Sequence, residues 1–218
     1  MWRFYFNQLL DTLPFFLKGL WMTVAVSALS LVAGTLLGFA LGILRGSGIR
    51  PVRWAVVAWT DLIRGTPFLV QVFIVFFILP EFGIQLEAFP AAVIALSNMS
   101  ACFICEIVAG GIAAVPAGQT EAALSSGLSP YQRMRHVIMP QAMRMILPPL
   151  VGQYVLLIKD SSVVSVIGVS DVTRVGWLTV QRIPEGIMVF GLVGLLYFCV
   201  CYPLILLSNN LEKRMKNA

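Results

Sequence analysis

The sequence is poor in charged side chains. Asp, Glu, Lys and Arg together make up 11% of its 218 residues, whereas hydrophobic residues make up 59% and the mean hydropathy is +0.89. A soluble domain carries about 25% charged residues, so this chain has too little charge to cover a surface that faces water. We therefore expect most of its surface to face lipid.

Residues that commonly form catalytic and metal centres are also scarce. The chain has one histidine, His136, and four cysteines. Cys102 and Cys105 form a lone C-x-x-C without the second pair that a zinc site wants, so we interpret all four as packing thiols. No lysine follows a glycine, and the phosphate-binding pattern G-x-x-x-x-G-K-[ST] is therefore absent. We predict that the chain is not an enzyme, has no catalytic residues, and binds neither metal nor cofactor itself.

Long uncharged runs are present instead. A helix needs about 20 residues to cross the hydrocarbon of a bilayer, and runs of comparable length occupy residues 19–44, 88–105 and 187–211. Two further apolar stretches, at residues 54–79 and 145–169, are each interrupted by a pair of charged residues. All of these lengths exclude membrane-barrel strands of about 10 residues. We predict an all-α, polytopic membrane protein, a single domain over residues 1–218 with about five spans, near 19–44, 54–79, 88–110, 145–169 and 187–211.

Basic residues predict the orientation, because Lys and Arg favour the cytoplasmic side of a membrane. Nine lie in segments that follow the first, third and last predicted spans: Arg45, Arg50, Arg53, Arg133, Arg135, Arg144, Lys213, Arg214 and Lys216. The opposite side holds Arg3, Lys18, Arg174 and Arg182 among several acidic residues. With five spans, this distribution places the N-terminus outside and the C-terminus in the cytoplasm. Basic residues divided among three short segments do not form a nucleic-acid footprint, so we expect no nucleic-acid partner.

A polar stretch at about residues 116–142 interrupts the apolar pattern. Ser129 and Gln132 have the spacing of a capping box, with Pro130 at the first helical position between them. Gly127 can end the preceding helix in a left-handed turn. The sequence therefore predicts two helices joined by a sharp bend, near 119–126 and 130–139. Three prolines are expected to separate this stretch from the next span: Pro140, Pro148 and Pro149.

The composition of this stretch favours a protein partner. Ala122, Ala123 and Gly127 are small and permit close approach of another backbone, whereas a helix that rests on lipid favours large apolar residues. An interfacial amphipathic helix is the alternative interpretation.

The order of motifs along the chain resembles the permease family of polar amino-acid ABC importers. The likeness covers about residues 12–214. Its motifs are Arg64-Gly65-Thr66-Pro67 with Gln71, Glu106-Ile107 with Gly110-Gly111-Ile112, Glu121-Ala122-Ala123 with Gly127, Ile138 and Pro140, and Lys159-Asp160-Ser161-Ser162 with Val166-Ile167-Gly168-Val169. The chain departs from the family pattern at Ala109, where Arg is frequent, and at Ser161, where Thr is usual.

The resemblance implies a type I importer permease in a bacterial cytoplasmic (inner) membrane, working by alternating access. A cytoplasmic ABC ATPase dimer would bind ATP and magnesium and dock on the coupling loop at about residues 116–142. An extracytoplasmic solute-binding protein would deliver polar amino acids, and a second permease subunit, identical or homologous, would complete the pathway within the lipid bilayer. The implied ATPase-docking residues are Glu121, Ala122, Ala123, Gly127, Ser129, Tyr131 and Arg133.

Ionisable side chains inside spans are costly and mark candidate functional positions. Lys159 and Asp160 lie well inside the fourth predicted span, whose helix we expect to start near Ile146. Neighbouring residues on a helix point about 100° apart, so the two cannot simply neutralise one another. Ser161 and Ser162 add hydroxyls that suit a substrate carboxylate. The alternative is a structural pair with partners elsewhere in the bundle.

The remaining candidates lie in the second and third spans. Gln71, Asn98 and Glu106 are candidates for the substrate path, with interhelical hydrogen bonding or salt bridging as the alternative. Asp61 and Arg64, three residues apart, are assigned to structure or gating together with Pro67, which is expected to kink the second span. Two rival functions remain open: an ion-coupled secondary transporter, which would show paired broken helices, and a membrane scaffold.

Overall fold

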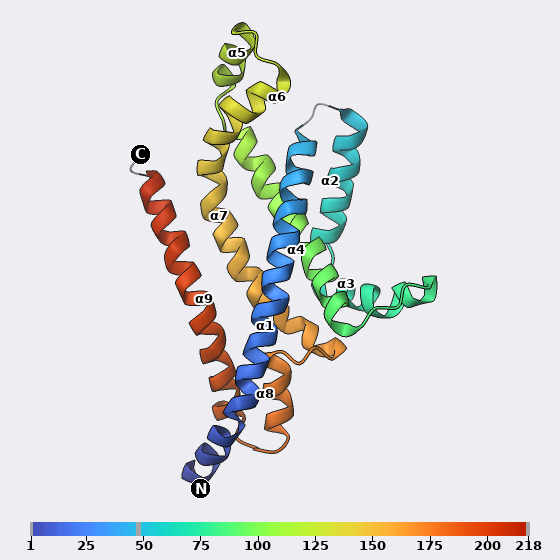
Figure 1. Cartoon of the computed structure of the whole chain (residues 1–218), viewed down its shortest axis with the longest axis vertical. Helices are drawn as coiled ribbons and strands as arrows, with labels where there is room; N and C mark the ends of the chain where they lie inside the picture. The colour runs from blue at the N-terminus through green and yellow to red at the C-terminus, as the bar shows by residue number, and fades with distance from the viewer. Residues whose placement is uncertain (1, 47–48, 217–218) are drawn as a thin grey trace.

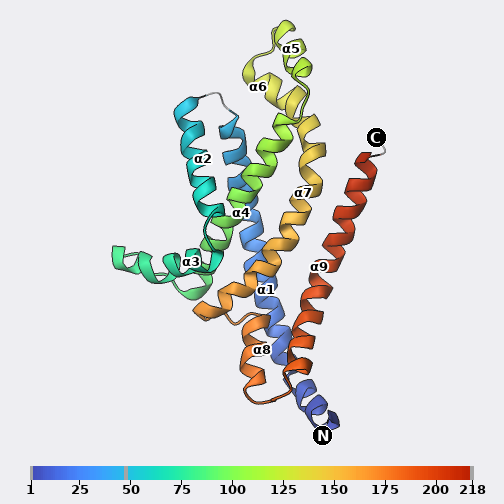
Figure 2. The same ribbon diagram turned by 180° about the vertical axis from the view of Figure 1, so that it is seen from behind.

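The computed structural model describes residues 2–46 and 49–216, and every regular element in that part of the chain is helical. Four long helices run lengthwise (Figures 1 and 2): α1 (Trp2–Arg45), α4 (Ala88–Ala113), α7 (Met139–Asp160) and α9 (Gly186–Lys216). The shorter helices are α2 (Arg50–Arg64), α3 (Phe68–Phe73), α5 (Ala117–Ser125), α6 (Pro130–Arg133) and α8 (Val172–Val180). The side chains of Arg3, Arg214 and Lys216, part of the charge count above, lie outside what the structure describes.

Within the described ranges, four helical stretches are long and apolar enough to cross a membrane: Asn7–Arg45, Ala88–Ala113, Pro130–Ile167 and Gly186–Lys213. A fifth is counted if the bent pair formed by α2 and the helical turns up to Phe82 is one span. The predicted all-α, polytopic fold is thereby confirmed.

Helices α1 and α4 share the most extensive packing in the molecule. Gly34, Gly38 and Gly42 recur every four residues on α1 and face α4. A Cβ atom on Gly38 would lie 2.6 Å from the Cβ of Ile104, closer than any real contact. The absence of side chains at these positions lets the two backbones approach each other closely.

The predicted span at residues 54–79 is broken more sharply than the kink expected at Pro67. α2 ends at Arg64, α3 starts at Phe68, and the axes of the two halves differ by 104°. Pro67 is extended (φ −60°, ψ 135°), which removes the chain from helical geometry. Gln71 spans the break, because its Nε2 donates to the carbonyl oxygens of Ile63 at 2.7 Å and Thr66 at 3.2 Å. After α3, a π-helical turn (Ile74–Ile78) and a 3₁₀ turn (Leu79–Phe82) continue to the loop before α4.

The expectation that Pro140, Pro148 and Pro149 separate the polar stretch from the next span is wrong. α6 passes through a π-helical turn (Met134–Ile138) directly into α7, with Pro140 in its first turn and the other two inside it. Tertiary packing outweighs the lost backbone bonds: Ile146 and Leu150 are buried, and the Ser208 hydroxyl of α9 donates to the Pro148 carbonyl at 3.1 Å.

Because α6 continues into α7, Lys159 and Asp160 lie at a different place in the helix from the one expected. α7 starts at Met139, seven residues before the expected Ile146, and Lys159 and Asp160 are its last two residues. A 3₁₀ helix (Ser161–Ile167) follows and ends at Gly168, whose φ is 100°. The pair therefore lies at the point where the helix tightens, instead of in its middle.

The two ends of the bundle differ. The hairpin formed by α5 and α6 projects beyond α4 and α7 at one end, toward which the C-terminal part of α9 also runs (Figure 1). The start of α1 lies at the opposite end, beside α8 (Figures 1 and 2). The two ends of the chain thus lie at opposite ends of the bundle.

Candidate functional site

The hairpin at the end of the bundle is built by local sequence signals. Gly127 has φ 73°, and the backbone N–H of Leu128 donates to the Ala123 carbonyl at 3.1 Å, which ends α5. Ser129 and Gln132 form the predicted capping box: the Gln132 N–H donates to Ser129 Oγ at 3.3 Å and the Ser129 N–H to Gln132 Oε1 at 3.0 Å. The predicted bend and the predicted start of the second helix at Pro130 are confirmed, whereas its predicted end near residue 139 is not, since that helix continues into α7.

The hairpin presents a mixed surface. Glu121 and Ala122 are exposed, and Tyr131 is 67% exposed, with its Oη accepting a hydrogen bond from Arg135 at 2.9 Å. Ala123, grouped with these residues from the sequence, is instead buried inside the hairpin. Leu124 is 55% exposed and was not singled out, because a nine-residue helix with no apolar stripe does not reveal which face is free. Ala123 thus shapes the hairpin, and its neighbours form the surface.

The base of the hairpin is held firmly against two spans. Gln141 at the start of α7 donates through Nε2 to Gln119 Oε1 at 3.1 Å, which ties α5 to α7. Below this bond, Val115, Ile138 and Ile146 belong to one buried cluster that also includes residues of α4. A force applied to the hairpin therefore reaches α4 and α7 through packed side chains and not through a loose linker.

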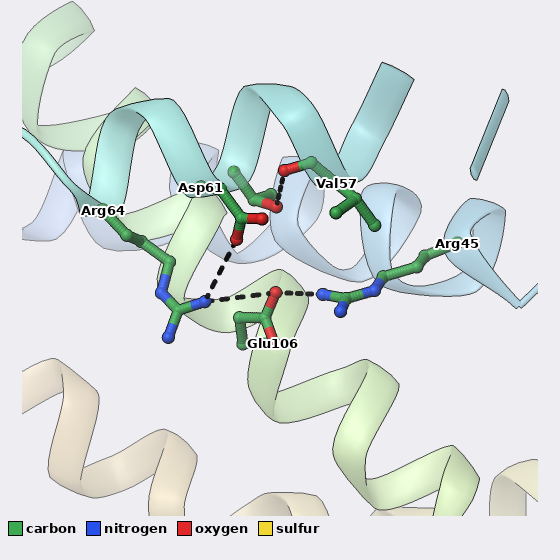
Figure 3. A network of polar contacts seen from close by, with 6 residues as sticks. Arg45, Val57, Asp61, Arg64 and Glu106 are labelled. Carbon is green, nitrogen blue, oxygen red and sulfur yellow. Dashed lines mark hydrogen bonds and ion pairs between the residues drawn. The ribbon is translucent and has the colours of Figure 1, made fainter. Parts of the chain in front are cut away.

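A network of charges joins three helices within the bundle (Figure 3). Glu106 of α4 pairs with Arg45 at the end of α1 and with Arg64 at the end of α2, where Arg64 Nη1 lies 3.2 Å from Glu106 Oε1. Arg64 also lies 4.0 Å from Asp61, the predicted i, i+3 pair. Arg45 was not recognised as a partner of Glu106, since 61 residues separate them and no local spacing signals the contact.

The structure gives Gln71 and Asn98 polar contacts within the subunit. Gln71 is buried at the α2–α3 break, as described above, and its Oε1 accepts no hydrogen bond from any described residue. Asn98 is partly exposed and accepts a hydrogen bond from Trp59 Nε1 at 3.2 Å. These contacts connect helices. A role for either residue in the substrate path stays a prediction.

The charges at the end of α7 have no such partners. Lys159 is exposed and Asp160 is half-buried, and neither takes part in an ion pair with another described residue. Ser161 is buried and donates to the Ile158 carbonyl at 2.7 Å, which occupies its hydroxyl hydrogen, while Ser162 is partly exposed. Among the described residues, Lys159 and Asp160 are therefore charges at the end of α7 that no ion pair engages.

In residues 2–46 and 49–216, no three His, Cys, Asp or Glu side chains come together in a group that could hold a metal ion. The described residues thus form a projecting hairpin, an ionic network around Glu106, and a pair of charges at the end of α7.

Comparisons with known proteins place this arrangement in context. Residues 34–217 match the family described as binding-protein-dependent transport system inner membrane component. The arginine transport system permease protein ArtQ of Bacillus subtilis (strain 168) is 34% identical over 97% of both chains. The glutamine transport system permease protein GlnP of Escherichia coli (strain K12) is 32% identical over 98% of this chain and 99% of its own. The crystal structure of an amino acid ABC transporter with histidines superposes with a TM-score of 0.88, at 34% identity over 96% of this chain and 98% of that one.

Proposed function

The chain belongs to the binding-protein-dependent transport system inner membrane components, and we propose that it is the permease subunit of an ATP-powered importer for polar amino acids. The observation that supports this assignment most strongly is the family match over most of the chain. The capped hairpin at the end of the spans agrees with it. The chain itself is a multi-pass membrane protein of a transport system.

The shape of the hairpin and its packing support the partners that we propose. A cytoplasmic ABC ATPase dimer that binds ATP and magnesium docks on the exposed face of α5 and α6, and the packing at the hairpin base transmits its closure to α4 and α7. The hairpin end is therefore cytoplasmic, the N-terminus lies outside, and the membrane is the bacterial inner membrane. An extracytoplasmic binding protein delivers the substrate, and a second permease subunit completes a path that five spans cannot enclose.

The open charges on α7 suit an amino-acid substrate. An ammonium such as that of Lys159 attracts a carboxylate, and a carboxylate such as that of Asp160 attracts an α-ammonium group, so the two together complement a zwitterion. Unpaired charges within a span are costly unless a ligand, water or another subunit faces them. We assign the pair to substrate recognition and the network around Glu106 to holding α1, α2 and α4 together.

The two rival functions have less support. An ion-coupled carrier is expected to show broken helices in repeated pairs, whereas one bent pair, α2 with the turns up to Phe82, is found in the described ranges. A scaffold has no need of unpaired charges at the end of α7. The relatives of known function that resemble this chain over its whole length are named as transport permeases.

A docking experiment tests the proposal. Gly127→Asp places a charged side chain on the hairpin, where a Cβ atom meets nothing within 4 Å and Asp tolerates a positive φ better than most residues. Gly83→Asp is the matched control, because Gly83 also has a positive φ (83°) and open space but lies before α4, far from the hairpin. The tagged chain is purified in mild detergent from its native membrane, and bound proteins are identified.

We expect a P-loop ATPase to co-purify with the wild type and with Gly83→Asp, and to be lost from Gly127→Asp. Retention of the ATPase by Gly127→Asp would refute the docking site. Absence of any ATPase from the wild type, in a preparation that keeps the second permease subunit, would refute the importer assignment itself.

A further inference from the structure

A cavity of about 400 Å³ lies between α1 and α8, at the end of the bundle opposite the hairpin. Its walls are mainly apolar and include Phe15, Met22, Leu178 and Ile183. The volume falls in the range of small-molecule sites, roughly 300 to 1,000 Å³. Phe15 and Leu178 are 60% and 46% exposed, so the cavity opens to the outer surface of the subunit.

Two basic side chains, Lys18 of α1 and Arg182 after α8, also line this cavity. Both are exposed, and neither forms an ion pair with an acidic residue in the part of the chain that the structure describes. Asp171, the buried carboxylate of this region, is already engaged: it accepts hydrogen bonds from the Arg174 N–H at 2.9 Å and the Tyr197 hydroxyl at 3.2 Å. No acidic side chain is among the described residues that line the cavity, so its lining carries two positive charges.

The position of these cations matches the headgroup level of a bilayer. Lys18 and Arg45 bound the uncharged run of α1, and the helix from one to the other rises about 40 Å, close to the thickness of a bilayer with its headgroups. Arg182 lies four residues before α9, whose own uncharged run starts at Ile187. Arg182 lines the same cavity as Lys18, so we place both cations at one headgroup level, with Met22 of the apolar wall inside the uncharged run of α1.

From this combination we propose that the cavity binds an anionic phospholipid, with its phosphate between Lys18 and Arg182 and an acyl chain against the apolar walls. The chemistry that recognises it is a phosphate attached to an apolar chain. Basic residues near a membrane surface attract anionic lipid, and apolar walls give no affinity to a phosphate that lacks a chain. A bound lipid here would brace α8 against α1 at the outer end of the bundle.

Native mass spectrometry of the detergent-purified complex tests the proposal. The complex is incubated with equal amounts of dioleoyl phosphatidylglycerol and dioleoyl phosphatidylcholine, and the lipid retained by the permease is measured. The variants are Lys18→Gln, Arg182→Gln and the double change. Arg53→Gln and Lys213→Gln are matched controls, because they remove the same charge from exposed positions outside the cavity.

We expect the wild type and both controls to prefer the phosphatidylglycerol. Each single variant should lose about fivefold in affinity for it, and the double variant about thirtyfold, since each cation near the surface contributes a comparable share. Leu178→Trp, a change at an exposed position that fills the mouth without altering charge, should also lower retention.

Three results would overturn the proposal. The wild type could retain both lipids equally, or the double variant and Leu178→Trp could both retain phosphatidylglycerol as the wild type does. Displacement of the lipid by inorganic phosphate at the same concentration would assign the cations to a free anion instead of a lipid.

Discussion

Replacement of Glu106 by Gln is the change that best probes the interior of the bundle. Glu106 lies between Arg45 and Arg64, each from a different helix, and its side chain is 27% exposed (Figure 3). Glutamine has nearly the same shape but no charge. The variant therefore keeps the packing of α4 and leaves two guanidinium groups facing a neutral side chain.

The magnitude follows from the geometry. At the 3.2 Å between Arg64 Nη1 and Glu106 Oε1, one ion pair is worth about 5 kcal/mol at an effective dielectric of 20 and about 1 kcal/mol in water. All three side chains are partly exposed, so solvent reduces the attraction, and folding also costs desolvation. A net loss of about 2 to 3 kcal/mol is the expectation, in the range of hydrogen bonds to charged groups.

The assay is thermal unfolding of the purified complex in one detergent. For a chain of this size a loss of 1 kcal/mol lowers the Tm by about 2 to 4 °C, so Glu106→Gln should lower it by about 4 to 12 °C. Glu87→Gln is the control, because Glu87 lies at the other end of α4, is exposed, and makes no side-chain cap hydrogen bond. Equal Tm values for Glu106→Gln and Glu87→Gln would refute the network as a source of stability.

Two further variants test the packing of α1 and the charges of α7. Gly38→Ala should destabilise the protein by roughly 1 to 3 kcal/mol in the same assay, since its Cβ would lie 2.6 Å from that of Ile104. Gly191→Ala is the control and should not destabilise it, because a Cβ there meets nothing within 4 Å. Equal effects of the two changes would contradict the close approach of α1 and α4. Asp160→Asn should lower uptake of a polar amino acid into proteoliposomes by about tenfold or more while the subunits still co-purify, because one charged contact is lost; unchanged kinetics would exclude Asp160 from substrate recognition.

Local signals in the sequence were sufficient for the long apolar helices and for the bend and helix start in the hairpin. The length of an uncharged run decides whether a helix can cross lipid, and that property needs no tertiary contact. The bend at Gly127 and the capping box at Ser129 likewise depend on residues within one turn of each other. The prolines were misread for the opposite reason. Whether a helix continues through Pro148 depends on what α9 and α4 pack against it.

The candidate site, like the fold, was predictable from the sequence only where it depends on local signals. The sequence by itself determined that the protein is a helical membrane protein with a polar stretch between its apolar runs, because composition and short-range spacing carry that information. Its likeness to permeases rests on the order of motifs along the chain. Only the tertiary structure decided that Arg45 pairs with Glu106, that Ala123 is buried, and that Lys159 and Asp160 end a helix without an ion pair to another described residue. Contacts between residues far apart in the chain depend on how helices pack. In lipid-facing helices that are apolar on every side, the sequence pattern does not reveal which face meets which neighbour.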